Sequence, residues 1–492
     1  MLRVLNCKNM LAAFRNFYQA QRVPIILFVT AFVFHAAMSA YLYYRFGDSV
    51  LWFQNEDAQG YVELARNVLT GRGFTHDGAA LAIRTPAWPL MLSLGLLLPG
   101  SATAAILFLQ VVLLGASGII IYKIGELFFS KFAGLIASTL YIVEPYLAMN
   151  TALATTEVFF NFGLLITVYC FGRWYLRRDS QAWLAASGLW LGLCILIRPV
   201  ALYLPFLFLI FIIIRHLRFK KSTLSLLVSL FILSATTTLV VAPWSIRQYI
   251  RFGTPRITNI DAMLLYFRVA PLVIGAEQGI SYNAAIQQLH GELERSVELY
   301  NPDDLNANFV HYEFMSARVA ELVRQRPDVV AKSYLASMVP ALFGTGYEYM
   351  LEEVLGLERA TQRPSYSALL ARGDFAAYFR ALRQIDIFQA VLLTGALLWM
   401  AAYVFIVYYV TRRFVWRERF LSLVLLGGLL GYFVFFALGP ASHARYRLPT
   451  FPWWFLLIGA SLDFIKQKRI LGSRKEAASF GLNKPFIPGQ TP

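Results

Sequence analysis

The chain of 492 residues is 58% hydrophobic and only 15% charged, a balance that leaves a water-soluble protein of this length too little polar surface to cover its core. Its formal net charge is +16, but the Lys and Arg residues fall mostly in short segments between apolar runs, where they set membrane topology. The composition therefore predicts an integral membrane protein and argues against nucleic-acid binding.

The chain begins with a basic segment, residues 1–23, which contains Arg3, Lys8, Arg15 and Arg22. The apolar stretch that follows reaches Tyr44 and is too long for a typical signal-peptide core. We therefore expect a cytoplasmic N-terminal segment and an uncleaved first membrane helix.

Ten apolar runs are long enough, or nearly so, to cross a bilayer. They cover residues 24–44, 103–128, 132–149, 155–176, 181–198, 199–214, 224–243, 388–410, 420–437 and 447–465. A shorter run, 86–98, has Pro86 and Pro89 at its front and gives only about 20 Å of helix, so we expect it to lie in the outer interface as a juxtamembrane helix. When it is not counted as a span, the basic clusters around Arg173, Arg215 and Arg412 all fall inside, as the positive-inside rule requires.

This topology predicts an all-α polytopic membrane protein of about ten transmembrane helices, with both termini in the cytoplasm. An N-terminal transmembrane catalytic module, 24–255, contains a first outer loop, 45–102, and is followed by a small α-rich outer domain, 256–387. In that domain Asn301 to Asp304 opens an amphipathic stretch typical of a helix. C-terminal transmembrane helices, 388–465, precede a basic cytoplasmic tail, 466–492, whose composition is typical of disorder.

The cysteines are expected to be packing residues, and the absence of glycosylation sequons favours a prokaryotic inner membrane. Cys7, Cys170 and Cys194 lie far apart, so no disulfide framework or CxxC metal site is available. The sequence contains no Asn-x-Ser/Thr sequon, which favours that membrane over a secretory one. Polar outer segments would then face the periplasm.

In the first outer loop, a segment from Glu56 to Leu69 has apolar residues at helical spacing and two carboxylates at its front, Glu56 and Asp57. Acids in this position stabilise the first turn of a helix through its free amides and its dipole. Helix capping and a functional site are both open interpretations of the pair.

Five further segments carry charged residues to the same membrane face. They contain Arg84; Glu144 and Glu157; Arg198; Arg247; and His443, Arg445, Tyr446 and Arg447. Arginine is disfavoured in short outer loops, so its repeated presence there favours a functional explanation. Its planar fork suits phosphate, and carboxylates serve as bases or metal ligands. For each residue alone, an interfacial anchor or a helix-capping acid remains an alternative.

The same segments resemble a family. Asp57-x-x-x-Tyr61-x-Glu63-x-Ala65-Arg66 looks like the first-loop motif of GT-C fold glycosyltransferases, relatives of the dolichyl-phosphate-mannose protein mannosyltransferases and bacterial aminoarabinose transferase. The later motifs follow in the same order: Arg84-Thr85-Pro86-Ala87-Trp88-Pro89, Thr155-Thr156-Glu157, Cys194-Ile195-Leu196-Ile197-Arg198-Pro199, Pro243-Trp244-Ser245-Ile246-Arg247 and Arg445-Tyr446-Arg447-Leu448-Pro449. The resemblance covers about residues 20–465.

This resemblance implies an inverting transferase of hexosyl or pentosyl type that takes a sugar from a polyprenyl-phosphate carrier at the outer face. Asp57 would be the catalytic base, with Glu157 orienting the acceptor or assisting through a metal. The arginines that would bind the donor phosphate are Arg84, Arg198, Arg247, Arg445 and Arg447. Supporting positions are Glu56, Tyr61, Glu63, Arg66, Glu144, His443 and Tyr446. The resemblance establishes no cofactor. A divalent metal is possible, but Ile83, which stands where the aminoarabinose transferase has an acid, argues against a metal site of the family's kind.

Other classes of protein fit parts of this pattern. A transporter or lipid flippase also has many spans, but it usually carries central charges and broken helices in internal repeats. Here the main polar interruptions of the spans are His35 and Gln110, which we expect to be packing residues. A non-catalytic scaffold is a third interpretation. The sequence leaves open the sugar, the acceptor (an envelope lipid, a polysaccharide or a protein) and the oligomeric state.

Overall fold

A computed structural model describes most of the chain. The described residues are 7–52, 56–76, 79–97, 101–177, 180–297, 310–348, 350–357, 376–377, 380, 387–414, 420–437 and 444–479. Helices dominate them, and the β structure among them is one antiparallel pair, β1 (Thr75–His76) with β2 (Ala79–Ala80). The expected all-α architecture is confirmed.

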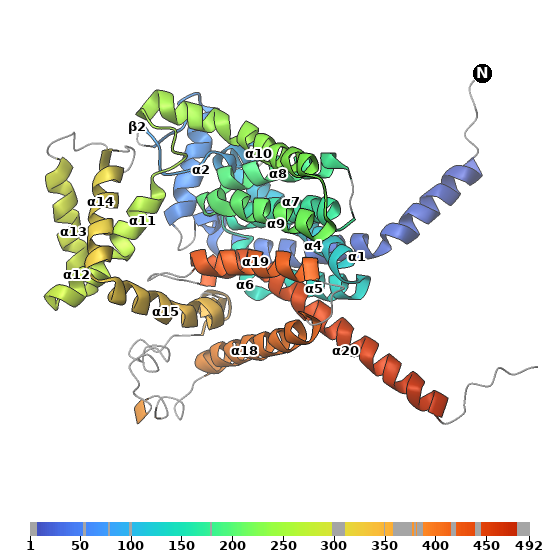
Figure 1. Ribbon diagram of the computed structural model, residues 1–492. Coiled ribbons are helices and arrows are strands. Elements are labelled where there is room, and N and C mark those ends of the chain that lie inside the picture. The colour runs from blue at the N-terminus through green and yellow to red at the C-terminus, as the bar shows by residue number, and fades with distance from the viewer. Residues whose placement is uncertain are drawn as a thin grey trace, which may run out of the picture.

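The N-terminal half of the fold is a helical bundle (Figure 1). Its elements are α1 (Cys7–Phe46), the 3-10 helix η1 (Gly47–Trp52), α2 (Glu56–Leu69), α3 (Ala87–Leu96), α4 (Ala102–Phe128), α5 (Lys131–Val143), α6 (Pro145–Asn150), α7 (Glu157–Arg177), α8 (Gln181–Ile197), η2 (Pro199–Tyr203), α9 (Leu204–Phe219) and α10 (Thr223–Phe252).

The C-terminal part adds three long apolar helices and a separate helical unit. Its elements are α11 (Ile260–Arg268), α12 (Ala270–Gln278), α13 (Tyr282–Val297), α14 (Val310–Gln325), α15 (Pro327–Phe343), the π-helix η4 (Met350–Val354), α18 (Ile387–Phe414), α19 (Phe420–Ala437), the 3-10 helix η6 (Ala444–Thr450) and α20 (Phe451–Ser479). We call α11 to α15 the outer unit.

Six of the described helical stretches are long and apolar enough to span a membrane. They are Gln21–Trp52, Ala102–Phe128, Pro199–Phe219, Thr223–Phe252, Ile387–Val410 and Arg445–Lys468. Shorter apolar helices include Lys131–Val143, Gln181–Ile197 and Phe420–Phe436. An integral membrane protein is therefore confirmed, while the count of ten spans stays a prediction.

Two apolar runs differ in length from a full span for an identifiable reason. The run 132–149 is divided into α5 and α6 at Glu144, because the proline that follows disfavours helical backbone at the preceding residue. The Glu144 carboxylate then caps α6 by accepting a hydrogen bond from Leu147 N at 2.6 Å. The run 86–98 forms α3, whose ten residues give about 15 Å of helix, too short to cross.

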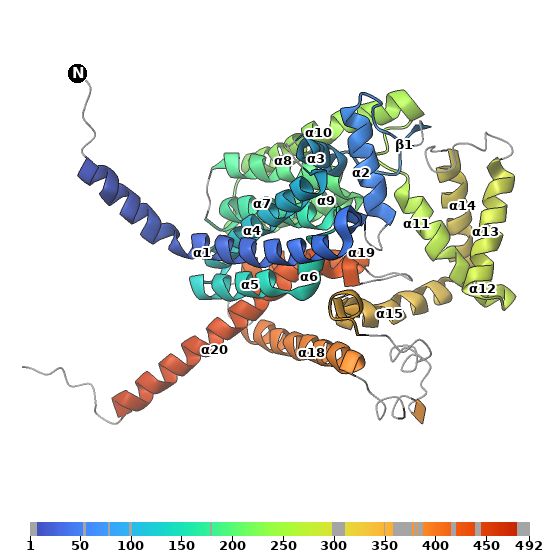
Figure 2. The same cartoon turned by 180° about the vertical axis from the view of Figure 1, so that it is seen from behind.

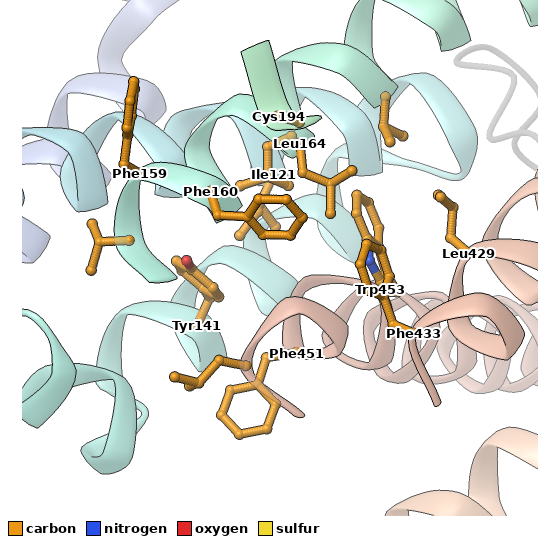
Figure 3. Close-up of a cluster of buried hydrophobic side chains, with 14 of the residues drawn as sticks. Ile121, Tyr141, Phe159, Phe160, Leu164, Cys194, Leu429, Phe433, Phe451 and Trp453 are labelled. Carbon is orange, nitrogen blue, oxygen red and sulfur yellow. The ribbon is translucent and has the colours of Figure 1, made fainter. Parts of the chain in front are cut away.

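The core joins helices from both ends of the sequence. Figure 3 shows Tyr141 of α5, Phe159 and Phe160 of α7, Phe433 of α19 and Trp453 of α20 in one cluster, and all five are buried. Helices α4 and α5 approach so closely that a Cβ on Gly125 would lie 2.2 Å from Gly134 Cα. Such contacts are typical of membrane helices that pack through small residues.

The polar interruptions of the spans are packing residues, as expected. His35 Nε2 lies 2.9 Å from the Ile142 carbonyl oxygen, and Gln110 donates to the Leu153 carbonyl oxygen at 2.7 Å. Cys170 and Cys194 are buried free thiols.

The outer unit has its own small core, separate from that of the bundle, formed by residues such as Tyr266, Leu289 and Met315. The outer unit lies at one end of the molecule. The N-terminal part of α1 and the C-terminal part of α20 project from the opposite end in both views (Figures 1 and 2). Basic residues lie in or next to the last turns of α7, α9 and α18, at Arg177, Lys220 and Arg412. Their placement on the cytoplasmic side stays a prediction. The domain boundaries themselves stay predictions, and Asn301 to Asp304 lies outside the described residues.

Candidate active site

Ionised side chains from five separate segments meet at the end of the bundle that faces the outer unit. The first of them is Asp57, in the first turn of α2. Arg84 NH2 donates to its Oδ1 at 2.6 Å, and Arg445 NH1 donates to its Oδ2 at 3.2 Å. Arg84 also contacts the Tyr61 hydroxyl at 3.4 Å and lies over its ring, 4.9 Å from the centroid. Both oxygens of the Asp57 carboxylate are thus held by arginines.

The second carboxylate is Glu157, the first residue of α7, which is fully buried. Arg198, at the C-terminal end of α8, donates to Glu157 Oε1 at 2.7 Å. The Arg445 Nε donates to the same oxygen. Arg445 therefore bridges Asp57 and Glu157, and we call these five residues (Asp57, Arg84, Glu157, Arg198 and Arg445) the bridged cluster.

Electrostatics keep the Asp57 carboxyl ionised. Burial by itself raises the pKa of Asp57, but the charges and hydrogen bonds of Arg84 and Arg445 outweigh it, so that the pKa lies below its ordinary value. Burial likewise disfavours the charged form of Arg84, while Tyr61 and Asp57 raise its pKa overall. Three arginines against two carboxylates leave the bridged cluster with one positive charge.

The backbone around Arg84 is fixed from both sides. Thr258 donates to the Ile83 carbonyl oxygen at 2.8 Å, and Thr85 donates to the Ile197 carbonyl oxygen at 3.1 Å. The second bond joins the Arg84 segment to the residue that precedes Arg198. Local hydrogen bonds therefore hold two arginines of the bridged cluster in a common frame.

Arg247 lies outside the bridged cluster. It donates to the carbonyl oxygens of Phe74 and Leu81, at 3.3 and 3.2 Å, and to Gln248 Oε1 at 2.6 Å. Its guanidinium also lies 4.6 Å from the Trp244 ring centroid. Arg247 thus braces the loop that leads to Arg84 against α10, rather than lying beside the two carboxylates.

Arg447 lies outside the bridged cluster too, although only one residue separates it from Arg445. It is 2% exposed, donates to the Leu342 carbonyl oxygen and lies over the rings of Trp399 and Phe451, at 4.6 and 5.1 Å. Among the described residues, its Nε and NH2 have no hydrogen-bond partner. The sequence grouped Arg445 and Arg447, whereas the structure separates them.

Of the expected supporting residues, one contacts the bridged cluster and the others lie outside it or outside the described residues. Tyr61 contacts Arg84, Tyr446 accepts from Arg268, and Glu144 caps α6. Glu63 and Arg66 lie further along α2, outside the bridged cluster. The side chain of Glu56 and the whole of His443 lie outside the described residues.

An apolar cavity of about 610 Å³ lies between α5, α18 and α20. Leu140, Val143, Leu398, Trp399 and Phe455 line it, and Glu144 and Tyr347 form a polar part of its wall. The Arg447 guanidinium lies 4.6 Å from the centroid of the Trp399 ring. The cavity therefore lies close to the segment that carries Arg445, although no residue of the bridged cluster lines it.

The donor set of the bridged cluster does not fit a divalent metal. Each carboxylate faces arginines, and no group of three His, Cys, Asp or Glu side chains gathers within the part of the chain that the structure describes. Metal sites of this kind normally combine several oxygen ligands.

Residues 84–244 match the sequence model of a family described as dolichyl-phosphate-mannose-protein mannosyltransferase. No curated protein matches the chain significantly. The matched segment contains Arg84, Glu157 and Arg198 of the bridged cluster.

The chain is similar to several solved structures. The chain is similar to the apo oligosaccharyltransferase of Archaeoglobus fulgidus with a TM-score of 0.50 and 15% identity, over 92% of this chain and 52% of that one. It therefore spans about half the length of that protein. AglB of the same organism, in complex with an inhibitory peptide and a dolichol-phosphate, has a TM-score of 0.49 and 14% identity, over 94% of this chain and 52% of that one. ArnT of Cupriavidus metallidurans, bound to undecaprenyl phosphate, has a TM-score of 0.39 and 12% identity, over 87% of this chain and 76% of that one.

The family model and the apo oligosaccharyltransferase together confirm the resemblance to GT-C fold glycosyltransferases. Neither supports the transporter alternative.

Proposed function

We propose that the protein is a membrane glycosyltransferase that moves a sugar from a polyprenyl-phosphate carrier to an envelope acceptor at the outer, periplasmic face of a prokaryotic inner membrane. The observation that carries this proposal is Arg445, which bridges Asp57 and Glu157 while Arg84 and Arg198 each hold one of these carboxylates. The single excess positive charge of the cluster complements an anionic donor phosphate.

The donor phosphate competes with Asp57 for Arg84 and Arg445. When these arginines turn to the phosphate oxygens, the Asp57 carboxylate loses the charges that depress its pKa, and its basicity rises. Asp57 is then free to accept the proton of an acceptor hydroxyl, a step that typically contributes about 10² to 10⁴ in rate. Phosphate binding and base activation are thereby one event.

In the transfer step, the acceptor oxygen forms a bond to the anomeric carbon as the bond from that carbon to the phosphate oxygen breaks. The bonding electrons leave with the phosphate, and the acceptor proton passes to Asp57. Arg84, Arg198 and Arg445 stabilise the growing negative charge on the leaving phosphate more than the ground state. A single displacement inverts the anomeric carbon, so we propose an inverting enzyme for a hexosyl or pentosyl donor.

The apolar cavity between α5, α18 and α20 supports the lipid nature of the donor. Its lining is almost entirely aliphatic and aromatic, and its residue Trp399 contacts Arg447, two residues from Arg445. A carrier whose phosphate contacts the arginines has an apolar path for its chain nearby. The outer domain, 256–387, is in this proposal the part that selects the acceptor.

The proposal is tested by mass spectrometry of envelope glycolipids, polysaccharides and glycoproteins from cells that make either the wild type or Asp57→Asn at equal membrane abundance. Loss of one sugar, with accumulation of its polyprenyl-phosphate donor, is the expected result. The matched control is Asp48→Asn, because Asp48 lies in the same outer loop but bonds Thr103 instead of an arginine. Unchanged glycosylation in the Asp57 variant would remove Asp57 from the role of base.

A further inference from the structure

The 3-10 helix η6, which carries Arg445, is attached to the outer unit through side chains. Arg268, the last residue of α11, donates from NH1 to the Tyr446 hydroxyl at 2.7 Å, and its guanidinium lies 5.7 Å from the centroid of that ring. Tyr446 directly follows Arg445 in the chain. The contact between these helices therefore lies one residue from the bridge of the active site.

The attachment continues on the other side of Tyr446. Arg447 donates to the Leu342 carbonyl oxygen, next to the end of α15. A contact from the bundle completes the set, because Asn161 of α7 donates to the Leu448 carbonyl oxygen at 3.2 Å. Successive residues of η6 thus contact the bridged cluster, α11, α15 and α7.

A short 3-10 helix has poor internal hydrogen-bond geometry and depends on its surroundings for its position. The donors of Arg445 must meet the oxygens of two carboxylates at once, and hydrogen bonds weaken steeply with misalignment. A shift of about 1 Å in a catalytic group can cost roughly 100-fold in rate. The position of η6 therefore controls the bridge.

The outer unit supplies a fixed point for this attachment. Tyr266, two residues before Arg268, is fully buried in the core of the unit and donates to the Leu289 carbonyl oxygen at 3.0 Å. The end of α11 therefore moves with the unit as a whole, and Arg268 carries that position to Tyr446.

We propose that Arg268 and Tyr446 are positioning residues through which the outer unit sets the place of Arg445 between Asp57 and Glu157. Neither residue contacts the two carboxylates; they act on the phosphate site through η6. This inference rests on the proposed function for its catalytic meaning, but the structural coupling itself is independent of it.

The first test measures the full-length protein in detergent without any turnover. Hydrogen exchange of backbone amides in residues 444–450 is compared for the wild type, Arg268→Ala and Tyr446→Phe. We expect about tenfold faster exchange in both variants, as one charge-assisted hydrogen bond is lost. The chain offers a matched control in Arg256 and Tyr312, an Arg–Tyr pair with the same donor–acceptor distance of 2.7 Å, whose tyrosine lies on α14 instead of η6. Exchange in residues 444–450 that stays at the wild-type rate in Arg268→Ala would overturn the proposal.

The second test measures the affinity of the same proteins for undecaprenyl phosphate. Arg268→Ala and Tyr446→Phe should each weaken binding about tenfold. The double variant should be no weaker than Arg268→Ala, which already removes both the hydrogen bond to Tyr446 and the contact with its ring. Arg268→Lys, which keeps a donor, should restore part of the affinity, and Arg256→Ala or Tyr312→Phe should have less than about a twofold effect. Additive losses in the double variant would contradict the coupling. If the wild type itself binds no undecaprenyl phosphate, the proposed function fails, while the exchange measurement still decides the positioning role.

Discussion

Arg445 and Arg447 lie on the same turn of η6, yet their surroundings differ in kind. Arg445 faces two carboxylates and keeps part of its side chain in contact with solvent, 23% exposed. Arg447 is 2% exposed, between a backbone carbonyl and two aromatic rings. A ligand anion can reach the first and would have to displace packed side chains to reach the second.

The comparison of Arg445 with Arg447 shows that two arginines of one sequence motif can have different roles. Cation–π contacts and a carbonyl acceptor make Arg447 an anchor of η6, whereas ion pairs make Arg445 an exchangeable partner for phosphate. Four sets of variants test this division, from the largest expected effect to the smallest.

The matched pair Arg445→Lys and Arg447→Lys gives the largest difference. An ammonium group keeps the charge but cannot bond two carboxylates in the forked geometry of a guanidinium, so Arg445→Lys should lower transfer by about 10² to 10³. Arg447→Lys should stay within about threefold of the wild type while lowering the melting temperature of the purified protein. Rate measurements at saturating donor, together with thermal unfolding, check both; equal rate losses would erase the distinction.

The next test compares the loss of a carboxylate inside the bridged cluster, Glu157, with the loss of one outside it, Glu144. Glu157→Gln leaves Arg198 and Arg445 without their buried counter-ion, and we expect transfer to fall about 100-fold. Glu144→Gln should alter turnover less than about threefold, because an amide oxygen can still accept from Leu147 N and cap α6. A larger loss of transfer in Glu144→Gln than in Glu157→Gln would contradict the distinction between the two carboxylates.

Arg247→Ala tests an arginine that braces a loop. Loss of its bonds to the Phe74 and Leu81 carbonyl oxygens should loosen the segment that ends at Arg84 and raise the donor KM about tenfold. Arg251→Ala, on an exposed position of the same helix, serves as the control and should leave the donor KM unchanged. A loss confined to kcat in Arg247→Ala would point instead to a direct contact with the reacting groups.

The smallest effect concerns pH. The folded-state pKa of Asp57 lies below its ordinary value, so its carboxylate is ionised above that ordinary value and becomes protonated only as the pH falls through the lower, folded pKa. The kcat/KM profile, which reports the free enzyme, should therefore be flat between about pH 5 and 7 on account of Asp57. In Arg84→Ala the acid limb should move to higher pH, because burial remains while one compensating charge is gone. An acid limb that stays in place would mean that Arg84 does not set the ionisation of Asp57.

Much of the site followed from the sequence because its members are side chains of recognisable type. Asp57, Arg84, Glu157, Arg198 and Arg445 were all expected on one face, and the structure brings them together. Membrane topology explains why these residues share a face, since alternate ends of successive antiparallel helices lie on the same side of the bilayer.

The contacts that the sequence could not predict are mainly hydrogen bonds from arginines to backbone carbonyl oxygens. Arg247 and Arg447 bind the carbonyl oxygens of Phe74, Leu81 and Leu342, and any residue offers a carbonyl, so no pattern of residue types marks the partner. Arg268 is a lone arginine at a helix end and gives no signal until its distance to Tyr446 is known. The interruption at Glu144 was readable in principle, because Pro145 follows it.

The double hold on Asp57 has a consequence for the order in which substrates bind. With both carboxylate oxygens bound by Arg84 and Arg445, an acceptor that arrives first meets a carboxylate whose basicity the two arginines lower. Under the proposed function the donor must add first, and an acceptor analogue should inhibit uncompetitively toward the donor. The same ion pairs re-form when the spent carrier departs, so Asp57 is again held by Arg84 and Arg445 until the next donor binds.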